Sequence, residues 1–136
     1  MSGEQKPEAS EVLIENSAGE ILMLLRDDKP TIPYPNQWDF IGGVVELGET
    51  PEQAVRREAR EEIGVELPNL RHLRTYDWPE KVEHVYHSLL TLNPKETNLT
   101  EGQEIRYFPK RDLLRMPLAF RDSEILNDLY GNLPDV

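Results

Sequence analysis

The sequence predicts an α/β domain in which a mixed β-sheet is covered by helices on both faces. Short β-prone runs occupy most of the chain, and one strong helical segment, residues 51–63, interrupts them near the middle. A second helical segment closes the chain. Strands that enclose one helix and precede another favour two helical layers on one sheet. No internal repeat or second domain is visible, so residues 10–136 are expected to form a single domain after a disordered lead over residues 1–9.

The predicted elements follow in order along the chain. Val12–Ile14 and Ile21–Leu25 are expected to form a hairpin, because the turn-forming residues 16–19 lie between them. Residues 27–37 contain three prolines and are expected to form a loop. The remaining expected elements are strands over 38–46, 70–78, 82–92 and 104–108, a polar loop over 93–102, and helices near 110–115 and 121–129.

Residues 50–64 give the clearest local signal. Thr50 is a typical N-cap residue, Pro51 suits the first helical position, and Gln53 completes a capping box. The segment that follows is rich in strong helix formers. Gly64 is well placed to end the helix in a left-handed conformation. The pattern therefore predicts a helix over residues 51–63.

The composition excludes several classes of function. The chain has fifteen Lys and Arg residues and 26 Asp and Glu residues, which gives a net charge of -11. A broad basic surface for binding a nucleic-acid duplex is therefore not expected. The chain has no cysteine, which rules out disulfides, thiolate zinc sites and a cysteine nucleophile. Its longest apolar run, residues 21–25, is far shorter than the ~20 residues of a membrane span, and its first residues lack a secretory signal. By elimination, a cytoplasmic location without membrane contact is expected.

Three glutamates break the amphipathic pattern of the predicted helix. The apolar stripe of this helix is made by Val55, Ala59 and Ile63. Glu58, Glu61 and Glu62 fall within an arc of roughly 100° beside that stripe, where the helix should meet the sheet. The arginines at 56, 57 and 60 are expected mostly on the opposite, solvated side.

This placement of three carboxylates carries a cost. Each like-charge pair three or four residues apart costs about 0.2–0.5 kcal/mol. Each acid in the last turns opposes the helix dipole by about 0.3–1 kcal/mol, and partial burial adds a larger desolvation cost. A divalent cation would turn this repulsion into binding, and oxygen-only ligands suit Mg²⁺, with Mn²⁺ also acceptable. The alternative is a surface helix with many salt bridges, which is common in Glu- and Arg-rich segments.

The glutamates belong to a longer pattern that begins in the loop before the helix. Its fixed positions are Gly43, Glu49, Arg57, Glu58, Glu61, Glu62 and Gly64. This spacing resembles the signature of the Nudix hydrolases, G-x5-E-x7-R-E-U-x-E-E-x-G-U, in which U is a bulky aliphatic residue. At roughly one chance in fifteen per position, seven matches arise about once in 10⁸ starting points. Ala59 is smaller than the usual aliphatic residue, and Ile41 stands where many members have proline.

The resemblance implies a fold, a reaction and a set of ligands. The implied fold is an α/β/α sandwich, and the implied reaction is hydrolysis of a nucleoside diphosphate linked to another group. Glu58, Glu61 and Glu62, with the carbonyl of Gly43, would hold one to three Mg²⁺ ions, which neutralise the pyrophosphate and activate water. Arg57 and Glu49 would support catalysis by orienting the loop and the ligands, whereas Gly64 would act as a helix stop.

Three residues outside the signature are further candidates. Glu101 lies in Thr100-Glu101-Gly102-Gln103, which resembles a segment of MutT-type members whose glutamate is a metal ligand or general base; the alternative is a solvated loop residue. Arg26 is a candidate for phosphate binding, with an exposed salt bridge as the alternative. Phe120 is a candidate for stacking on a base, with core packing as the alternative.

The resemblance leaves the substrate open. The segment around Glu101 favours a MutT-like nucleoside triphosphate pyrophosphohydrolase that releases a nucleoside monophosphate and pyrophosphate. The alternatives are an ADP-ribose or NDP-sugar pyrophosphatase and a Nudix module that binds a nucleotide without hydrolysing it. Members of the family often dimerise, so a second copy of the chain is a further expected partner.

Overall fold

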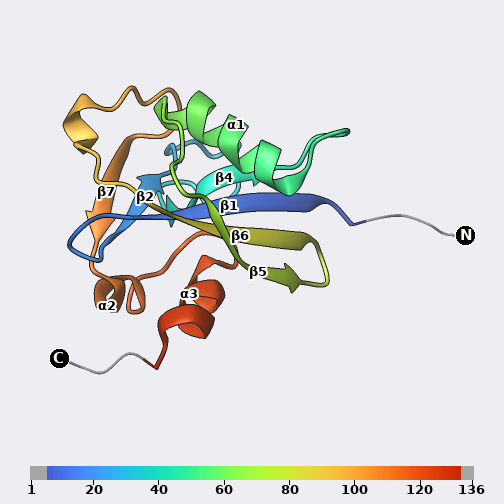
Figure 1. The fold of residues 1–136 in the computed structure, drawn as a ribbon. Coiled ribbons are helices and arrows are strands. Elements are labelled where there is room, and N and C mark those ends of the chain that lie inside the picture. Colours follow the sequence, from blue (N-terminus) through green and yellow to red (C-terminus); the bar gives the residue numbers. More distant parts are fainter. Residues whose placement is uncertain (1–5, 133–136) are drawn as a thin grey trace, which may run out of the picture.

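A computed structural model describes residues 6–132, and Figure 1 shows their arrangement. The elements are β1 (Glu8–Glu15), β2 (Ile21–Leu25), β3 (Trp38–Asp39), β4 (Ile41–Val44), α1 (Pro51–Ile63), β5 (Arg71–Asp77), β6 (Val82–Leu89), the 3₁₀ helix η1 (Pro94–Glu96), β7 (Glu104–Phe108), α2 (Lys110–Leu113) and α3 (Asp122–Tyr130). The expected bounds of β2, α1 and β7 are confirmed. The run expected as one strand over 38–46 is divided at Phe40 into β3, which pairs with β2, and β4, which pairs with β1.

The first strand begins earlier than the sequence indicated. The expected disordered lead covers residues 1–9, but β1 begins at Glu8. Glu8 pairs with Val82 of β6, and its carbonyl accepts a hydrogen bond from the N–H of Val45 at 2.9 Å. These backbone bonds order a polar segment that has no hydrophobic pattern of its own. Residues 1–5 of the expected lead lie outside the described residues.

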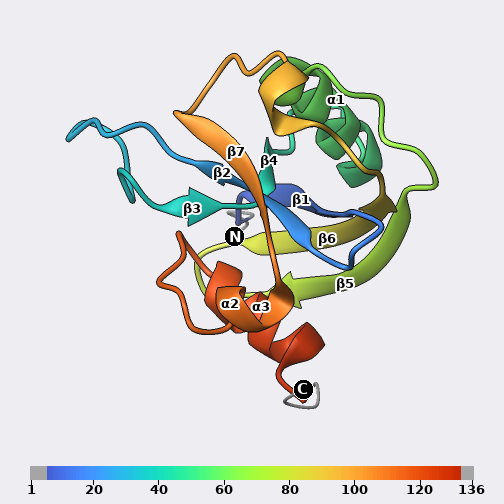
Figure 2. The same ribbon diagram turned by 90° about the vertical axis from the view of Figure 1, so that its left-hand side faces the viewer.

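All seven strands form one mixed sheet, as predicted. The first strand, β1, pairs with β6 in parallel on one side and with β4 in antiparallel on the other. Next to it, β2 pairs with both β7 and β3, also in antiparallel, and Figure 2 shows these two strands flanking β2. The edge strand β5 completes the path by pairing with β6. This topology places β1 at the centre of the sheet.

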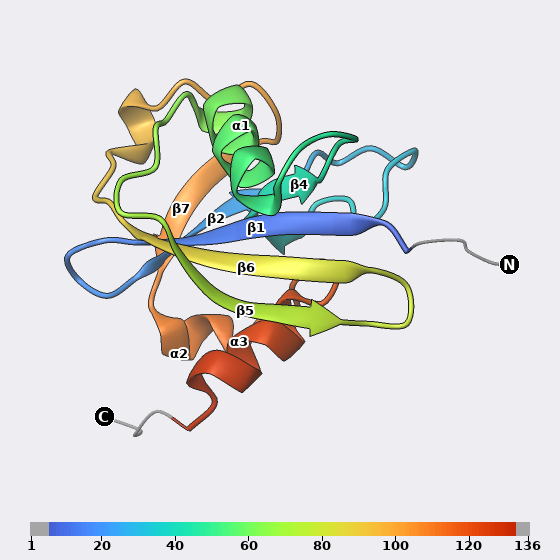
Figure 3. The same ribbon diagram turned by 45° about the vertical axis from the view of Figure 1, so that its right-hand side comes forward.

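Helices cover both faces of the sheet, which confirms the α/β/α sandwich. Figure 3 shows α1 on one side of β1 and β6, and α2 and α3 on the other. Successive residues of β1 point into opposite layers: Val12 and Ile14 pack with α1 residues such as Val55, and Leu13 packs with α3 residues such as Ile125. A strand buried on both faces needs an almost continuous apolar run. Within the described residues, no helix combines the length and apolar character needed to cross a membrane.

Candidate active site

Helix α1 is fixed at both ends by local interactions of its own sequence. The hydroxyl of Thr50 accepts a hydrogen bond from the N–H of Gln53 at 3.1 Å, and the Gln53 side chain accepts one from the N–H of Thr50 at 2.9 Å. Gly64 ends the helix with φ 68°, a conformation that glycine adopts without a steric penalty. The capping box and the C-cap therefore fix where α1 begins and ends, and the packing of Val55, Ala59 and Ile63 on the sheet sets the direction of its glutamates.

The glutamates of α1 meet the sheet at two glycines of β4. Glu62 is 7% exposed, and its Oε1 accepts a hydrogen bond from the N–H of Gly42 at 3.1 Å. The Glu58 carboxylate packs against Gly43 so closely that a Cβ on residue 43 would lie 2.7 Å from Glu58 Cδ. Glu61 points outward, with 56% of its side chain exposed. The helical periodicity thus placed Glu58 and Glu62 correctly where α1 meets the sheet. Glu61, in contrast, lies at the solvent edge of this contact.

Burial leaves the charge of this group poorly compensated. Burial raises the pKa of Glu62 to about 9, with the nearby Glu58 carboxylate adding to the rise. Burial also raises the pKa of Glu58, and the Arg57 guanidinium opposes that rise. Carboxylates that are costly to ionise alone form a donor set suited to a hard divalent cation, on which their side chains can converge. The residues present therefore fit the metal that the Nudix signature implies.

Arg57 differs from its expected position on the solvated side of the helix. Its side chain folds back toward the site and is 23% exposed. Its Nε donates to Glu49 Oε2 at 2.7 Å, and its Nη1 donates to Glu58 Oε1 at 2.9 Å and to Glu61 at 3.2 Å. A further bond joins its Nη2 to the carbonyl of Val44 at 3.1 Å. Because arginine is long, the helical angle of its Cα does not determine where its guanidinium lies.

The loop that carries Glu101 is attached to the C-terminal end of α1. The N–H of Thr100 donates to the carbonyl of Glu62 at 3.0 Å, and the hydroxyl of Thr100 donates to the carbonyl of Glu61. Glu101 is exposed, and its charge is one of the influences that raise the pKa of Glu62. The structure therefore brings Glu101 close to the carboxylates of α1.

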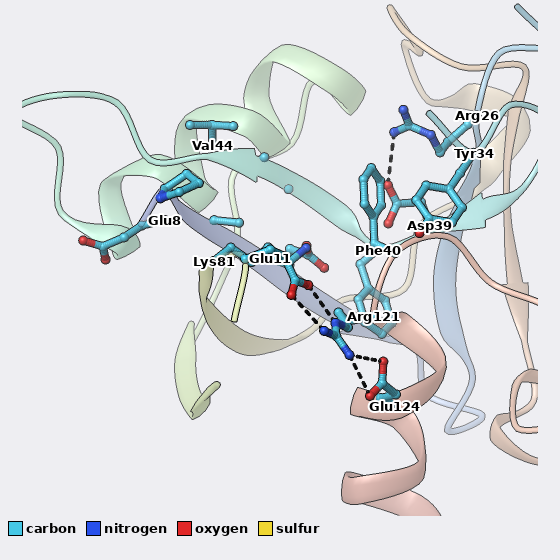
Figure 4. Close-up of a pocket in the computed structure, with 16 residues that line it drawn as sticks. Glu8, Glu11, Arg26, Tyr34, Asp39, Phe40, Val44, Lys81, Arg121 and Glu124 are labelled. Carbon is cyan, nitrogen blue, oxygen red and sulfur yellow. Dashed lines mark hydrogen bonds and ion pairs between the residues drawn. The ribbon is translucent and has the colours of Figure 1, made fainter. Parts of the chain in front are cut away.

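A cavity of about 770 Å³ opens beside Gly42 and Gly43. Both predicted substrate-binding residues, Arg26 and Phe120, line it, and the Arg26 guanidinium lies 5.0 Å from the Phe120 ring centre. Figure 4 shows Arg26 reaching the carboxylate of Asp39 at one end of this cavity, a contact of 3.3 Å. The cavity thus joins an aromatic and cationic region to the strand that contacts Glu58 and Glu62.

A family model described as the NUDIX domain matches residues 5–129. The chain belongs to the Nudix family. A segment of 55 residues, 40% of the chain, is 46% identical to the nucleoside triphosphatase NudI of Escherichia coli, and it spans only 38% of that relative. A MutT structure described for Aliivibrio salmonicida and Vibrio cholerae matches 95% of this chain and 100% of its own, with a TM-score of 0.77 and 23% identity. A MutT Nudix hydrolase from Burkholderia pseudomallei matches 93% and 99%, with a TM-score of 0.76 and 25% identity.

Four inward-facing acids were missed in the sequence. Glu11, Glu83 and Asp122 are buried, and Asp39 is partly buried, with 14% of its side chain exposed. Glu11 and Glu83 share the inward strand parity of Leu13 and Val85. An acid in phase with buried apolar residues is a signal that strand periodicity alone could have revealed. In this Nudix chain these acids lie on the α3 side of the sheet, separate from the signature.

Proposed function

We propose that this Nudix chain is a MutT-like pyrophosphohydrolase that converts a nucleoside triphosphate to a nucleoside monophosphate and pyrophosphate. The observation that carries the proposal is the junction at Gly42 and Gly43. These two glycines line the cavity that contains Arg26 and Phe120, and Glu58 and Glu62 contact the same glycines without lining the cavity themselves. A nucleotide in this cavity would have its base at the aromatic end and its phosphates beside the carboxylates. The segment shared with a nucleoside triphosphatase supports a triphosphate substrate.

Residues of α1 and β4 would hold the divalent cation. Glu58, Glu61 and Glu62 supply carboxylate oxygens, and Gly43 supplies its carbonyl. Bound Mg²⁺ or Mn²⁺ supplies charge neutralisation of the pyrophosphate and acidification of water. Glycine at residue 43 lets Glu58 approach this strand closely, because a Cβ there would push the Glu58 carboxylate away from its position.

The surrounding residues orient this group and bind the nucleotide. Arg57 hydrogen-bonds to both Glu58 and Glu61, and Glu49 holds Arg57 in place through two hydrogen bonds. A Glu101 carboxylate oxygen accepts the proton of the attacking water, since its loop is anchored to the end of α1. The nucleotide is bound by Phe120, through stacking, and by Arg26, through its phosphates.

A substrate panel tests the proposed reaction. The purified chain is incubated with Mg²⁺ or Mn²⁺ and with NTPs, dNTPs, NDP-sugars, ADP-ribose or dinucleotides, and products are separated by anion-exchange chromatography. We expect an NTP or dNTP to give a monophosphate and pyrophosphate with the highest kcat/KM. Preferred cleavage of ADP-ribose or an NDP-sugar would replace the triphosphate assignment. Tight binding without any product over hours would instead identify a nucleotide-binding module.

The variant Glu62→Gln tests the role of the helix glutamates. Glutamine keeps an oxygen for the Gly42 N–H but removes the negative charge. We expect kcat to fall by about a thousand-fold, because the charge that holds the cation and stabilises the transition state is lost. Glu52→Gln is the matched control, since Glu52 is on the same helix and pairs only with Arg56 at the surface among the salt bridges seen. A Glu62→Gln protein as active as Glu52→Gln would contradict the assignment.

The variant Phe120→Leu tests the binding end of the cavity. Leucine keeps apolar volume but removes the aromatic face, and one stacking contact contributes about 1 kcal/mol. We expect KM to rise about five-fold while kcat stays within two-fold of the parent. Steady-state kinetics on the preferred substrate separates the two parameters. A fall in kcat with unchanged KM would place Phe120 outside the base-binding surface.

A further inference from the structure

Three acidic side chains from distant parts of the chain meet beneath the cavity. Glu11 comes from β1, Glu83 from β6 and Asp122 from the first turn of α3, and one oxygen of each lies within 4.8 Å of the others. All three residues are buried, with exposed fractions of 7%, 0% and 0%. Across residues 6–132, no other group of three potential metal ligands gathers in this way. We call Glu11, Glu83 and Asp122 the buried acidic triad.

Neighbouring donors orient two of these carboxylates, and one oxygen of each of the three has no partner. The indole N–H of Trp78 donates to Glu83 Oε1 at 2.9 Å, and the N–H of Phe40 donates to Asp122 Oδ2 at 3.0 Å. The atoms Glu83 Oε2, Asp122 Oδ1 and Glu11 Oε2 are buried and have no hydrogen-bond partner. Buried polar atoms are almost always satisfied. Three such acceptors in one place need positive charge among them, which either a cation or protons shared between the carboxyl groups can supply.

The charges around the triad leave room for one divalent ion. The ammonium of Lys81 lies 3.6 Å from Glu83 Oε1 and compensates one of the three negative charges. A fourth acid, Asp39, lies next to Asp122; its Oδ2 pairs with Arg26 at 3.3 Å, and its Oδ1 is also buried without a hydrogen-bond partner. Ionising the other two carboxylates without a further cation is strongly unfavourable, and burial accordingly raises the pKa of Glu11 and of Asp122 well above their ordinary values.

We propose that Glu11, Glu83 and Asp122 bind a hard divalent cation at a site separate from the glutamates of α1. Oxygens on opposite sides of such an ion are about 4–5 Å apart, because each metal–oxygen distance is about 2.1–2.5 Å. The spacing within the triad meets this limit. Glu11 lines the cavity, so an ion can enter from that side and complete its coordination with water. The ion links β1, β6 and α3 under the cavity floor.

Terbium luminescence tests this site, because Tb³⁺ binds oxygen ligands and emits when a nearby tryptophan is excited. Trp78 contacts Glu83 directly. The experiment uses the full chain with Trp38→Phe, which leaves Trp78 as the one tryptophan of the sequence. We expect strong Tb³⁺ emission that Ca²⁺ or Mn²⁺ displaces. Emission should fall at least ten-fold in Glu11→Gln and in Asp122→Asn, and should persist in the matched control Glu61→Gln. Equal emission in all variants, or emission lost only in Glu61→Gln, would overturn the proposal.

Thermal unfolding separates a bound cation from shared protons. Addition of millimolar Ca²⁺, Mg²⁺ or Mn²⁺ should raise the Tm of the parent and of Glu61→Gln by several degrees, because a ligand that binds the folded state stabilises it. The same addition should leave the Tm of Glu11→Gln unchanged. If protons neutralise the triad instead, Glu11→Gln unfolds at the same or a higher Tm than the parent, and the cations shift both proteins equally. That result would refute the site even if Asp122→Asn did not fold.

Discussion

The two acidic groups of this chain lie on opposite faces of one sheet and differ in how their charge is compensated. On the α1 side, Glu61 is exposed, Glu58 and Glu61 bind Arg57, and Glu62 alone is deeply buried. On the α3 side, all three carboxylates of the buried acidic triad are enclosed, and Lys81 is the nearby ammonium. A partly open group can exchange an arginine contact for a substrate contact. In an enclosed group, a bound cation instead changes the stability of the fold, because it binds only the folded chain.

Gly42 lies between the two groups, and its replacement should give the largest effect. A Cβ on Gly42 would lie 2.3 Å from the carbonyl oxygen of Ser10 and 2.7 Å from the Cα of Glu11, and these backbone atoms cannot move independently. We expect Gly42→Ala to lower the free energy of unfolding by about 2–4 kcal/mol. It should also abolish activity, because the backbone shift that the Cβ forces would displace the N–H that orients Glu62. Urea denaturation and initial rates measure the two effects.

Gly43→Ala is the matched comparison for that variant. A Cβ on Gly43 would meet the Glu58 side chain, which can rotate away. We expect a smaller stability loss, of about 1 kcal/mol or less, together with a large loss of activity because Glu58 is displaced. Equal losses of unfolding free energy in Gly42→Ala and Gly43→Ala would contradict the description of β4 as a strand that lies between the α1 glutamates and the buried acidic triad.

The two basic partners provide the next test of the difference between the groups. Arg57→Met removes the hydrogen bonds to Glu49, Glu58 and Glu61. We expect kcat to fall by about 10–100-fold, the usual range for a residue that orients metal ligands, with little change in Tm.

Lys81→Met removes the ammonium beside fully buried Glu83. In the absence of added cation, we expect a loss of about 1–3 kcal/mol in unfolding free energy.

Rescue by cation extends this comparison. Added Ca²⁺ or Mg²⁺ should not restore the stability of Lys81→Met fully, because three carboxylates then face one divalent ion without the ammonium.

Arg60→Met is a control for Arg57→Met, since Arg60 lies on the same helix and pairs with exposed Glu66. Similar kinetic losses in the two arginine variants would indicate a general effect on α1 and not a specific role of Arg57.

The sequence predicted the helix glutamates because their signal is local. The cap at Thr50, the stop at Gly64 and the fixed spacing all lie within one short segment, and the expected helix is confirmed. The close approach at Gly43 was also predictable, since a glycine inside a strand indicates contact with another group. Arg57 was misplaced because a helical wheel describes Cα directions and not the reach of a long side chain.

The buried acidic triad could not be assembled from the sequence. Glu11 and Glu83 become neighbours through the parallel pairing of β1 with β6, which joins residues more than seventy positions apart. Asp122 joins them through the packing of α3 under the sheet. Strand parity could have marked Glu11 and Glu83 as inward-facing acids, but it could not have shown that they meet.

A rim contact of the cavity should give the smallest effect, and it titrates in a defined range. The Arg121 guanidinium donates to both oxygens of Glu80, at 2.7 and 2.8 Å, and holds the pKa of Glu80 at about 2, below its ordinary value of about 4.5. Because the folded-state pKa is lowered, the contact stabilises the fold above about pH 4.5, and this stabilisation is lost as the pH falls toward 2. Glu80→Gln should therefore have a slightly lower Tm than the parent at pH 6.

At pH 2 the Tm difference should be much smaller, because Glu80 has lost about half of its charge in the folded parent and nearly all of it in the unfolded chain. The difference at pH 6 should also shrink in high salt, since the pair is exposed. Glu66→Gln, which removes the exposed partner of Arg60, is the control. A Tm difference between parent and Glu80→Gln that persists undiminished to pH 2 would mean that Glu80 acts through packing and not through its charge.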